Sequence, residues 1–130
     1  MSKTFTKIFI AATTLLVSCT SLPGTVNLRS YIPGTYARFV HNEFSNGSDT
    51  LMISELSKAG NNYRIVHKIT FQRMVEGKWS RPERKQEVWN AVYNEQEKLL
   101  HETVRGKLLS FNPEGRTLFV GTSEYKKIAE

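Results

Sequence analysis

Apolar and polar side chains alternate with a period of two over most of the chain beyond residue 34, which is the spacing of a strand with one buried face. The longest such run extends from Tyr63 to Val75. One face of this run carries Tyr63, Ile65, His67, Ile69 and Phe71, and the other face carries mostly polar side chains. The pattern therefore predicts a long strand with one face in the core and one in water.

Shorter runs of the same kind lie on both sides of this strand, separated by turn residues. They cover 36–41, 49–56, 85–93, 98–104, 107–111, 116–120 and 124–128. The Asn46-Gly47 pair in the polar stretch 41–48 predicts the turn between the first two strands, and Pro82 interrupts a hairpin tip that begins at Glu76. Beyond residue 18, no run of ten residues carries a convincing helical stripe.

Short strands with turn chemistry between them predict an all-β domain, here an antiparallel up-and-down meander of about eight strands. A meander with one apolar face hides its two edge strands best when the first strand pairs with the last. We therefore expect a closed or nearly closed β-barrel over residues 34–130.

The first eighteen residues follow a different pattern. Lys3 and Lys7 precede an unbroken run of apolar or small residues from 8 to 17, too short to span about 30 Å of hydrocarbon. This organisation is that of a signal peptide. Its end, Leu16-Val17-Ser18-Cys19, resembles the lipobox of bacterial lipoproteins, with a leucine three residues before the cysteine and a small residue just before it.

The lipobox resemblance implies that residues 1–18 are removed and that Cys19 becomes the first mature residue, carrying a diacylglycerol group. Two or more acyl chains attach a protein stably without a transmembrane segment. Thr20 rather than aspartate follows the cysteine, which in the sorting pattern of some bacteria favours the outer membrane, and no acidic run follows to favour surface display. We expect a lipid-anchored envelope protein that faces the periplasm. A cleaved secretory signal with an incidental cysteine is the alternative.

Cleavage would leave 112 of the 130 residues. The net charge would fall from +6 to +4, because the leader contains two lysines and no acidic residue. That length suits one small domain, preceded by a flexible tether over residues 19–33 that contains Pro23-Gly24. The charge suits contact with anionic headgroups or an acidic partner, and it is too small to indicate nucleic-acid binding. Since Cys19 is the only cysteine, acylation would leave no thiol for a disulfide, a metal site or a nucleophile.

A second resemblance concerns the barrel itself. Gly34-Thr35-Tyr36 resembles the G-x-W opening of lipocalins and related small calycin barrels, with tyrosine in place of tryptophan. Tyr125-Lys126-Lys127-Ile128 is similar to the basic last strand that packs over that aromatic residue in the family. The mid-chain motif and the C-terminal helix of the family are not visible. The resemblance implies a lipocalin-like barrel whose interior is either filled by side chains or holds one small ligand.

If the barrel keeps a cavity, the apolar face of the long strand and its neighbour would form the wall. The residues expected to line it are Tyr63, His67, Ile69, Phe71, Trp89 and Ala91. His67 lies between two isoleucines of that face. It is either a core or barrel-mouth histidine with one satisfied hydrogen bond, or a polar group that lines a ligand cavity.

No pattern typical of a catalytic or metal centre is visible. His41, His67 and His101 lie far apart in sequence, without the close-spaced pair that metal sites usually contain. No serine lies in a G-x-S-x-G turn, and no glycine-rich phosphate loop exists. Glu95 and Glu97 fall in one hairpin turn, whereas a glycosidase needs two carboxyl groups across a cleft. We expect no enzymatic activity, no metal and no cofactor.

The hairpin tip from Lys78 to Lys85 holds four basic residues, one acidic residue and an indole. Tryptophan and arginine often anchor protein interfaces, and both also sit well in a lipid headgroup layer. Lys78, Trp79, Arg81 and Arg84 are therefore the candidate partner-docking residues. The alternative is a solvated charged turn with Trp79 folded back over the end of the barrel.

Three functions fit these observations. The first is a non-enzymatic envelope lipoprotein that serves as a binding module for a protein partner or a small amphiphilic ligand. The second is a structural or accessory subunit of an envelope assembly, such as a secretion or conjugation apparatus. The third is an inhibitor or immunity-type protein that blocks a periplasmic enzyme.

Overall fold

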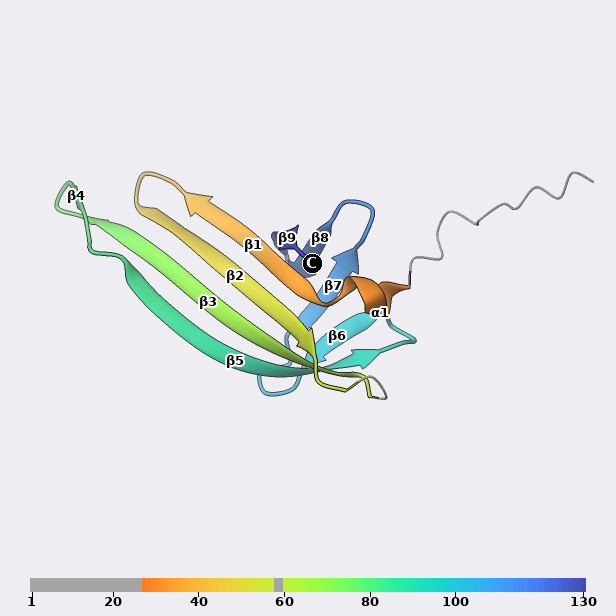
Figure 1. Cartoon of the computed structure of the whole chain (residues 1–130). Coiled ribbons are helices and arrows are strands. Elements are labelled where there is room, and N and C mark those ends of the chain that lie inside the picture. The colour runs from red at the N-terminus through yellow and green to blue at the C-terminus, as the bar shows by residue number, and fades with distance from the viewer. Residues whose placement is uncertain (1–26, 58–59) are drawn as a thin grey trace, which may run out of the picture.

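A computed structural model describes residues 27–57 and 60–130, and these residues form a closed antiparallel barrel of eight strands (Figure 1). The strands follow one another around the barrel in chain order: β1 (Gly34–His41), β2 (Ser45–Glu55), β3 (Asn62–Val75), β5 (Glu83–Asn94), β6 (Leu99–Glu102), β7 (Leu108–Asn112), β8 (Thr117–Val120) and β9 (Ser123–Ala129). A two-residue strand, β4 (Lys78–Trp79), pairs with the end of β3. The predicted all-β meander and its closure are confirmed.

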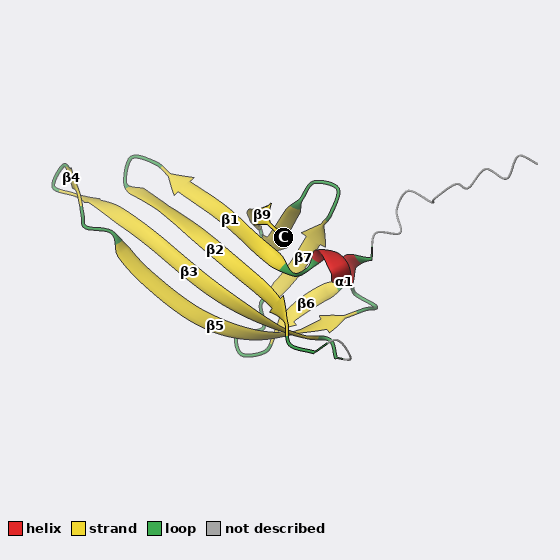
Figure 2. Ribbon diagram, viewed as in Figure 1, coloured by secondary structure: helices red, strands yellow, loops and turns green. Residues whose placement is uncertain are grey.

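The strands differ greatly in length, so the barrel closes only at one end. β3 has 14 residues and pairs with β2 and β5 over most of its length, whereas β6 and β8 have 4 each. β1 pairs with β9 only between Thr35 and Ala37, and β5 pairs with β6 only from Ala91 to Asn94. Beyond these points β1, β2, β3 and β5 continue as a free four-stranded ribbon, which Figures 1 and 2 show reaching away from the short strands. We call residues 39–48 and 68–86 the extension.

One helical turn, α1 (Leu28–Tyr31), plugs the closed end of the barrel. Tyr31 and Ile32 are buried, and the side chain of Asn27 caps the turn by accepting a hydrogen bond from the N–H of Arg29. The hydroxyl of Tyr36 lies 3.0 Å from the carbonyl oxygens of both Tyr31 and Ile32. The expected tether over 19–33 is therefore too long, because the buried residues from Tyr31 on belong to the domain. Residues 1–26, including Cys19, lie outside the described residues.

The described part of the chain contains no helix that is both long enough and apolar enough to cross a membrane.

Lys127 of β9 ties the plug to the seam between the first and last strands. Its ammonium group donates a hydrogen bond to the carbonyl of Tyr31 at 2.6 Å and lies 4.2 Å from the centre of that residue's ring. It also lies 5.7 Å from the ring centre of Tyr36 and 3.0 Å from a carboxylate oxygen of Glu130. A contact between the basic last strand and Tyr36, expected from the calycin-like sequence motifs, is thus present through Lys127.

The interior of the closed end is filled by side chains from every long strand and from the plug. The core consists of Tyr31, Ile32, Tyr36, Leu51, Ile53, Tyr63, Ile65, Trp89, Ala91, Tyr93, Leu100, Leu109, Leu118 and Tyr125. Three edge-on aromatic contacts join Tyr31, Tyr36 and Phe111, with ring centres 6.0–6.2 Å apart. This end is a packed core of the kind that an eight-stranded barrel can form with side chains alone.

The predicted turn at Asn46-Gly47 is wrong, because both residues lie within β2. The chain instead reverses at Asn42, whose side-chain oxygen accepts hydrogen bonds from the N–H groups of Phe44 and Ser45 at 2.9 and 2.8 Å. Such local capping by an asparagine side chain supports a turn. The backbone of Gly47 lies very close to that of Thr70, since a Cβ atom at position 47 would lie 2.4 Å from the carbonyl oxygen of Thr70.

The plug gives a direct test of the domain boundary. Ile32→Ala is expected to lower the free energy of unfolding by about 2–5 kcal/mol, because Ile32 is fully buried and its removal leaves a cavity. The matched control is Ile128→Ala, at a side chain that is 58% exposed, which should cost less than about 1 kcal/mol. Urea denaturation measures both values. Equal, small effects would show that residue 32 belongs to a tether.

Candidate functional site

A cavity of about 400 Å³ lies where the closed barrel gives way to the extension. Its wall comes from all sides of the barrel: Arg38, Asp49, His67, Trp89, Lys107, Leu108, Val120, Gly121, Ser123 and Tyr125. These residues belong to seven strands, to the turn before β7 and to the turn after β8. We call this cavity the mouth.

The inward positions of the strands explain why polar groups meet at the mouth. Arg38 pairs with Asp49 across β1 and β2, two residues beyond the buried Tyr36. Because strand side chains alternate between faces, residues two apart share the inner face. His67 follows Ile65 on the inner face of β3 in the same way. The first inward position beyond the core thus changes from apolar to polar on three neighbouring strands.

Asp49 is the centre of a hydrogen-bonded group in the mouth. Nε2 of His67 donates to Oδ1 of Asp49, and the hydroxyl of Tyr125 donates to Oδ2 at 2.8 Å. Burial opposes ionisation of this carboxyl, but the two hydrogen bonds together with the nearby His67 and Arg38 outweigh burial and hold the pKa of Asp49 below its ordinary value of 3.8. Burial, followed by the hydrogen bond to Asp49, raises the pKa of Tyr125. Asp49 is therefore an ionised carboxylate with both oxygens occupied.

His67 and Trp89 form the floor of the mouth, with ring centres 4.6 Å apart. Nδ1 of His67 is buried without a hydrogen-bond partner, and the nearby Oε2 of Glu87 lies 4.0 Å away. The hydrogen bond from the indole N–H of Trp89, at 3.1 Å, is the largest cause that lowers the pKa of Glu87, and Arg105 adds to it. Because Nδ1 is covered, a molecule in the mouth could not give its proton to His67 without a rearrangement. The arrangement suits binding better than acid–base catalysis.

Two cations of the mouth have no carboxylate partner among residues 27–57 and 60–130. No ion pair within 4 Å involves Arg38 or Lys107 in that part of the chain, although Arg38 acts on Asp49 and Lys107 acts on Glu102 at longer range. The ammonium of Lys107 lies over the indole of Trp89, 4.4 Å from the ring centre. A cation on an aromatic face retains its charge for a further partner.

The structure divides the expected ligand-lining residues into three groups. His67 and Trp89 line the mouth. Ile69 and Phe71 lie half-buried on the inner face of the extension. Tyr63 and Ala91 are buried in the packed core, so extra bulk at Ala91 would disturb the core instead of blocking a cavity.

Sequence reasoning missed Arg38, Asp49, Lys107 and Tyr125 as members of the site. Alternation could have placed Arg38 on the inner face with Tyr36, since the two residues are two apart in one strand. Asp49 was not predicted as a site residue because the second strand was expected to begin at this position. Lys107 lies in the turn after β6, and no sequence signal places it over Trp89.

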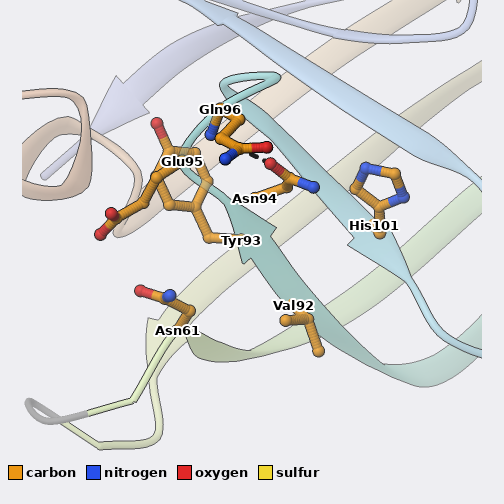
Figure 3. Close-up of a pocket in the computed structure, with 7 residues that line it drawn as sticks. All are labelled: Asn61, Val92, Tyr93, Asn94, Glu95, Gln96 and His101. Atoms are coloured by element: carbon orange, nitrogen blue, oxygen red, sulfur yellow. Dashed lines mark hydrogen bonds between the residues drawn. The ribbon is translucent and has the colours of Figure 1, made fainter.

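A second hollow lies outside the barrel, beside the turn between β5 and β6 (Figure 3). Its lining residues are Asn61, Val92, Tyr93, Asn94, Glu95, Gln96 and His101. The side chain of Asn94 accepts hydrogen bonds from the N–H groups of Gln96 and Glu97, so it holds the turn. His101 is already bonded to Glu97 at 2.8 Å. These polar groups serve the turn itself, and the mouth remains the better candidate site.

The candidate docking residues lie at the far end of the extension from α1. Lys78, Arg81 and Arg84 are exposed, and Trp79 remains 42% exposed on β4 instead of folding back over the barrel. The neighbouring hairpin tip presents Phe44, which is 74% exposed, and the N–H of Met74 donates to its carbonyl at 2.9 Å. The two hairpin tips therefore form one surface. We call this surface, which carries Phe44, Lys78, Trp79, Arg81 and Arg84, the distal tip.

Among the described residues, no three histidine, cysteine, aspartate or glutamate side chains are grouped to hold a metal ion. Comparisons of the chain with protein-family models, with curated proteins and with solved structures found no significant match. Fold and site together define a small antiparallel barrel that is packed at one end and has a polar cavity at the other.

The Asp49 group predicts a pH-dependent contribution to stability. Since the folded protein lowers the pKa of Asp49, its stabilising effect is present above the unfolded value near 3.8 and is lost as the pH falls through the lower folded value. Asp49→Asn is therefore expected to reduce the free energy of unfolding by about 1–3 kcal/mol at pH 7, with a smaller difference at pH 3. Urea denaturation at both pH values measures this. A difference that grows toward pH 3 would contradict the assignment.

Proposed function

We propose that the protein is a non-enzymatic, lipid-anchored module of the bacterial envelope that binds a small amphiphilic ligand at the mouth of its barrel. The observation that supports this most is the mouth itself, a cavity of about 400 Å³ over an otherwise packed interior. Binding cavities for small ligands usually measure about 300–1,000 Å³ and combine apolar walls with a few polar groups. The mouth has this size and contains the apolar side chains of Trp89, Leu108 and Val120, but its share of polar groups is larger than in most such cavities.

The position of the expected lipid anchor is compatible with a mouth that opens away from the membrane. Asn27 directly precedes α1, which plugs the end of the barrel opposite the extension (Figure 1). Cys19 lies eight residues before Asn27, a stretch of chain that reaches at most about 28 Å. A lipid on Cys19 would hold the plugged end near the membrane, in our proposal the outer membrane, and leave the mouth turned toward the periplasm.

A second candidate function is docking to an envelope protein, as in an accessory subunit of an assembly. It is favoured by the exposed aromatic side chains of Phe44 and Trp79 at the distal tip, with three exposed cations beside them. Exposed aromatic groups beside arginine are typical anchors of protein interfaces. The distal tip lies away from the expected anchor, so a protein partner fits it better than the headgroups of the same membrane.

Native mass spectrometry of the lipidated protein, isolated from membranes in mild detergent, tests the first proposal. An added mass of a few hundred daltons is expected on the protein. Val120→Phe should remove it, because the larger side chain fills the mouth. The matched control is Val104→Phe, at a residue that is 83% exposed, and it should keep the added mass.

The same spectra discriminate between the two candidates. No added mass on any form, or equal added mass on the two phenylalanine variants, would contradict ligand binding at the mouth. A co-isolated polypeptide that is lost in Trp79→Ala/Arg81→Ala, without a change in melting temperature, would instead support docking through the distal tip.

A further inference from the structure

We propose that the ligand of the mouth carries an anionic group, a carboxylate or a phosphate, that binds between Arg38 and Lys107. This inference rests on the proposed function, since it names the chemical class of the ligand at the same cavity. It follows from which acceptors, donors and charged groups in the lining of the mouth are free to contact a ligand.

The acidic group that lines the mouth already has part of its hydrogen-bonding capacity in use. Both oxygens of Asp49 already accept hydrogen bonds, one from His67 and one from Tyr125. A cationic ligand would meet two positive side chains, Arg38 and Lys107, and a single carboxylate whose two oxygens each already accept a hydrogen bond. The mouth therefore disfavours a cation for electrostatic reasons.

The positive groups, in contrast, are available. The charges of Lys107 and Glu102 interact, and Glu87 is hydrogen-bonded to the indole that Lys107 covers, but both carboxylates have other hydrogen-bond partners. Glu102 accepts hydrogen bonds from the N–H groups of Val104 and Arg105, both at 2.8 Å, and Glu87 is engaged by Arg105 and by the indole of Trp89. The ammonium of Lys107 and the guanidinium of Arg38 thus keep donors for an anion, and Ser123 adds a hydroxyl to the same lining. Charged donors of this kind give short, strong hydrogen bonds to carboxylate and phosphate oxygens.

The protein also offers an apolar surface to the apolar part of the ligand. Leu108, Val120 and the indole of Trp89 line the mouth beside the cations. Farther out, Ile69 and Phe71 follow His67 on the inner face of β3 and remain partly exposed. An alkyl chain that leaves the mouth along β3 would cover these two side chains. The geometry thus fits an anionic head with an apolar chain.

Calorimetric titration with four eight-carbon compounds separates the head group from the chain. The probes are octanoate, octyl phosphate, octyl glucoside and octyltrimethylammonium, added to the Cys19→Ala protein so that no acyl chain of the protein interferes. Octanoate, octyl phosphate or both should bind, and the neutral and cationic probes should bind at least tenfold more weakly. The anion that binds with the higher affinity shows whether the ligand of the mouth carries a carboxylate or a phosphate group.

Two charge-matched double variants locate the effect. Arg38→Gln/Lys107→Gln should weaken binding of the preferred anion by roughly a hundredfold, on the basis of about tenfold for each charged hydrogen bond. Arg64→Gln/Lys126→Gln removes the same charge from exposed positions and should change the affinity less than about threefold.

The possible outcomes separate this inference from the proposed function. Equal binding of all four probes, or equal weakening by the two double variants, overturns the anion site and leaves a ligand-binding mouth in place. Failure of both anions to bind, while native mass spectrometry still finds a ligand lost in Val120→Phe, overturns the anion site alone. Failure of every probe together with absence of any such ligand overturns both.

Discussion

The inequality of the strands is the constraint on which the rest of the structure depends. β3 and β5 have 14 and 12 residues, whereas β6 and β8 have 4 each. A sheet can close into a barrel only where all its strands are present, so closure is limited to the end that holds α1. That end is filled and sealed, the opposite end opens into the mouth, and the long strands continue as the extension (Figure 2).

The change from a filled to an open interior also explains why polar groups gather where they do. Most inward side chains near α1 are apolar, and the ammonium of Lys127 is paired with a carbonyl and a carboxylate. At the level of the mouth, water can reach the interior, so charges can be tolerated there at lower cost than in the core. His67 and Tyr125 donate the hydrogen bonds to Asp49, so neither Arg38 nor Lys107 forms an ion pair within 4 Å in the described part of the chain. The proposed preference for an anion is a consequence of this arrangement.

Period-two alternation was sufficient to predict the all-β class, the long strand over 63–75 and the closed meander, because each strand has one buried face. It was not sufficient to predict where the barrel stops being closed, since that depends on which residues of β1 and β5 find partners on β9 and β6. For the same reason the residues expected at a cavity separate: His67 and Trp89 line the mouth, whereas Tyr63 and Ala91 lie in the core. The plug was missed because Tyr31 and Ile32 are too few to produce a helical stripe.

Hydrogen–deuterium exchange along β3 tests the central claim, that one end of the barrel is closed and the other free. Protection reflects the local free energy of opening, which is highest where a strand is buried. The account predicts strong protection of the amides of Tyr63 and Ile65 and of the seam residues Tyr36 and Lys127, with markedly faster exchange from Thr70 to Val75. Uniform protection along β3, or fast exchange at the seam between β1 and β9, would contradict it.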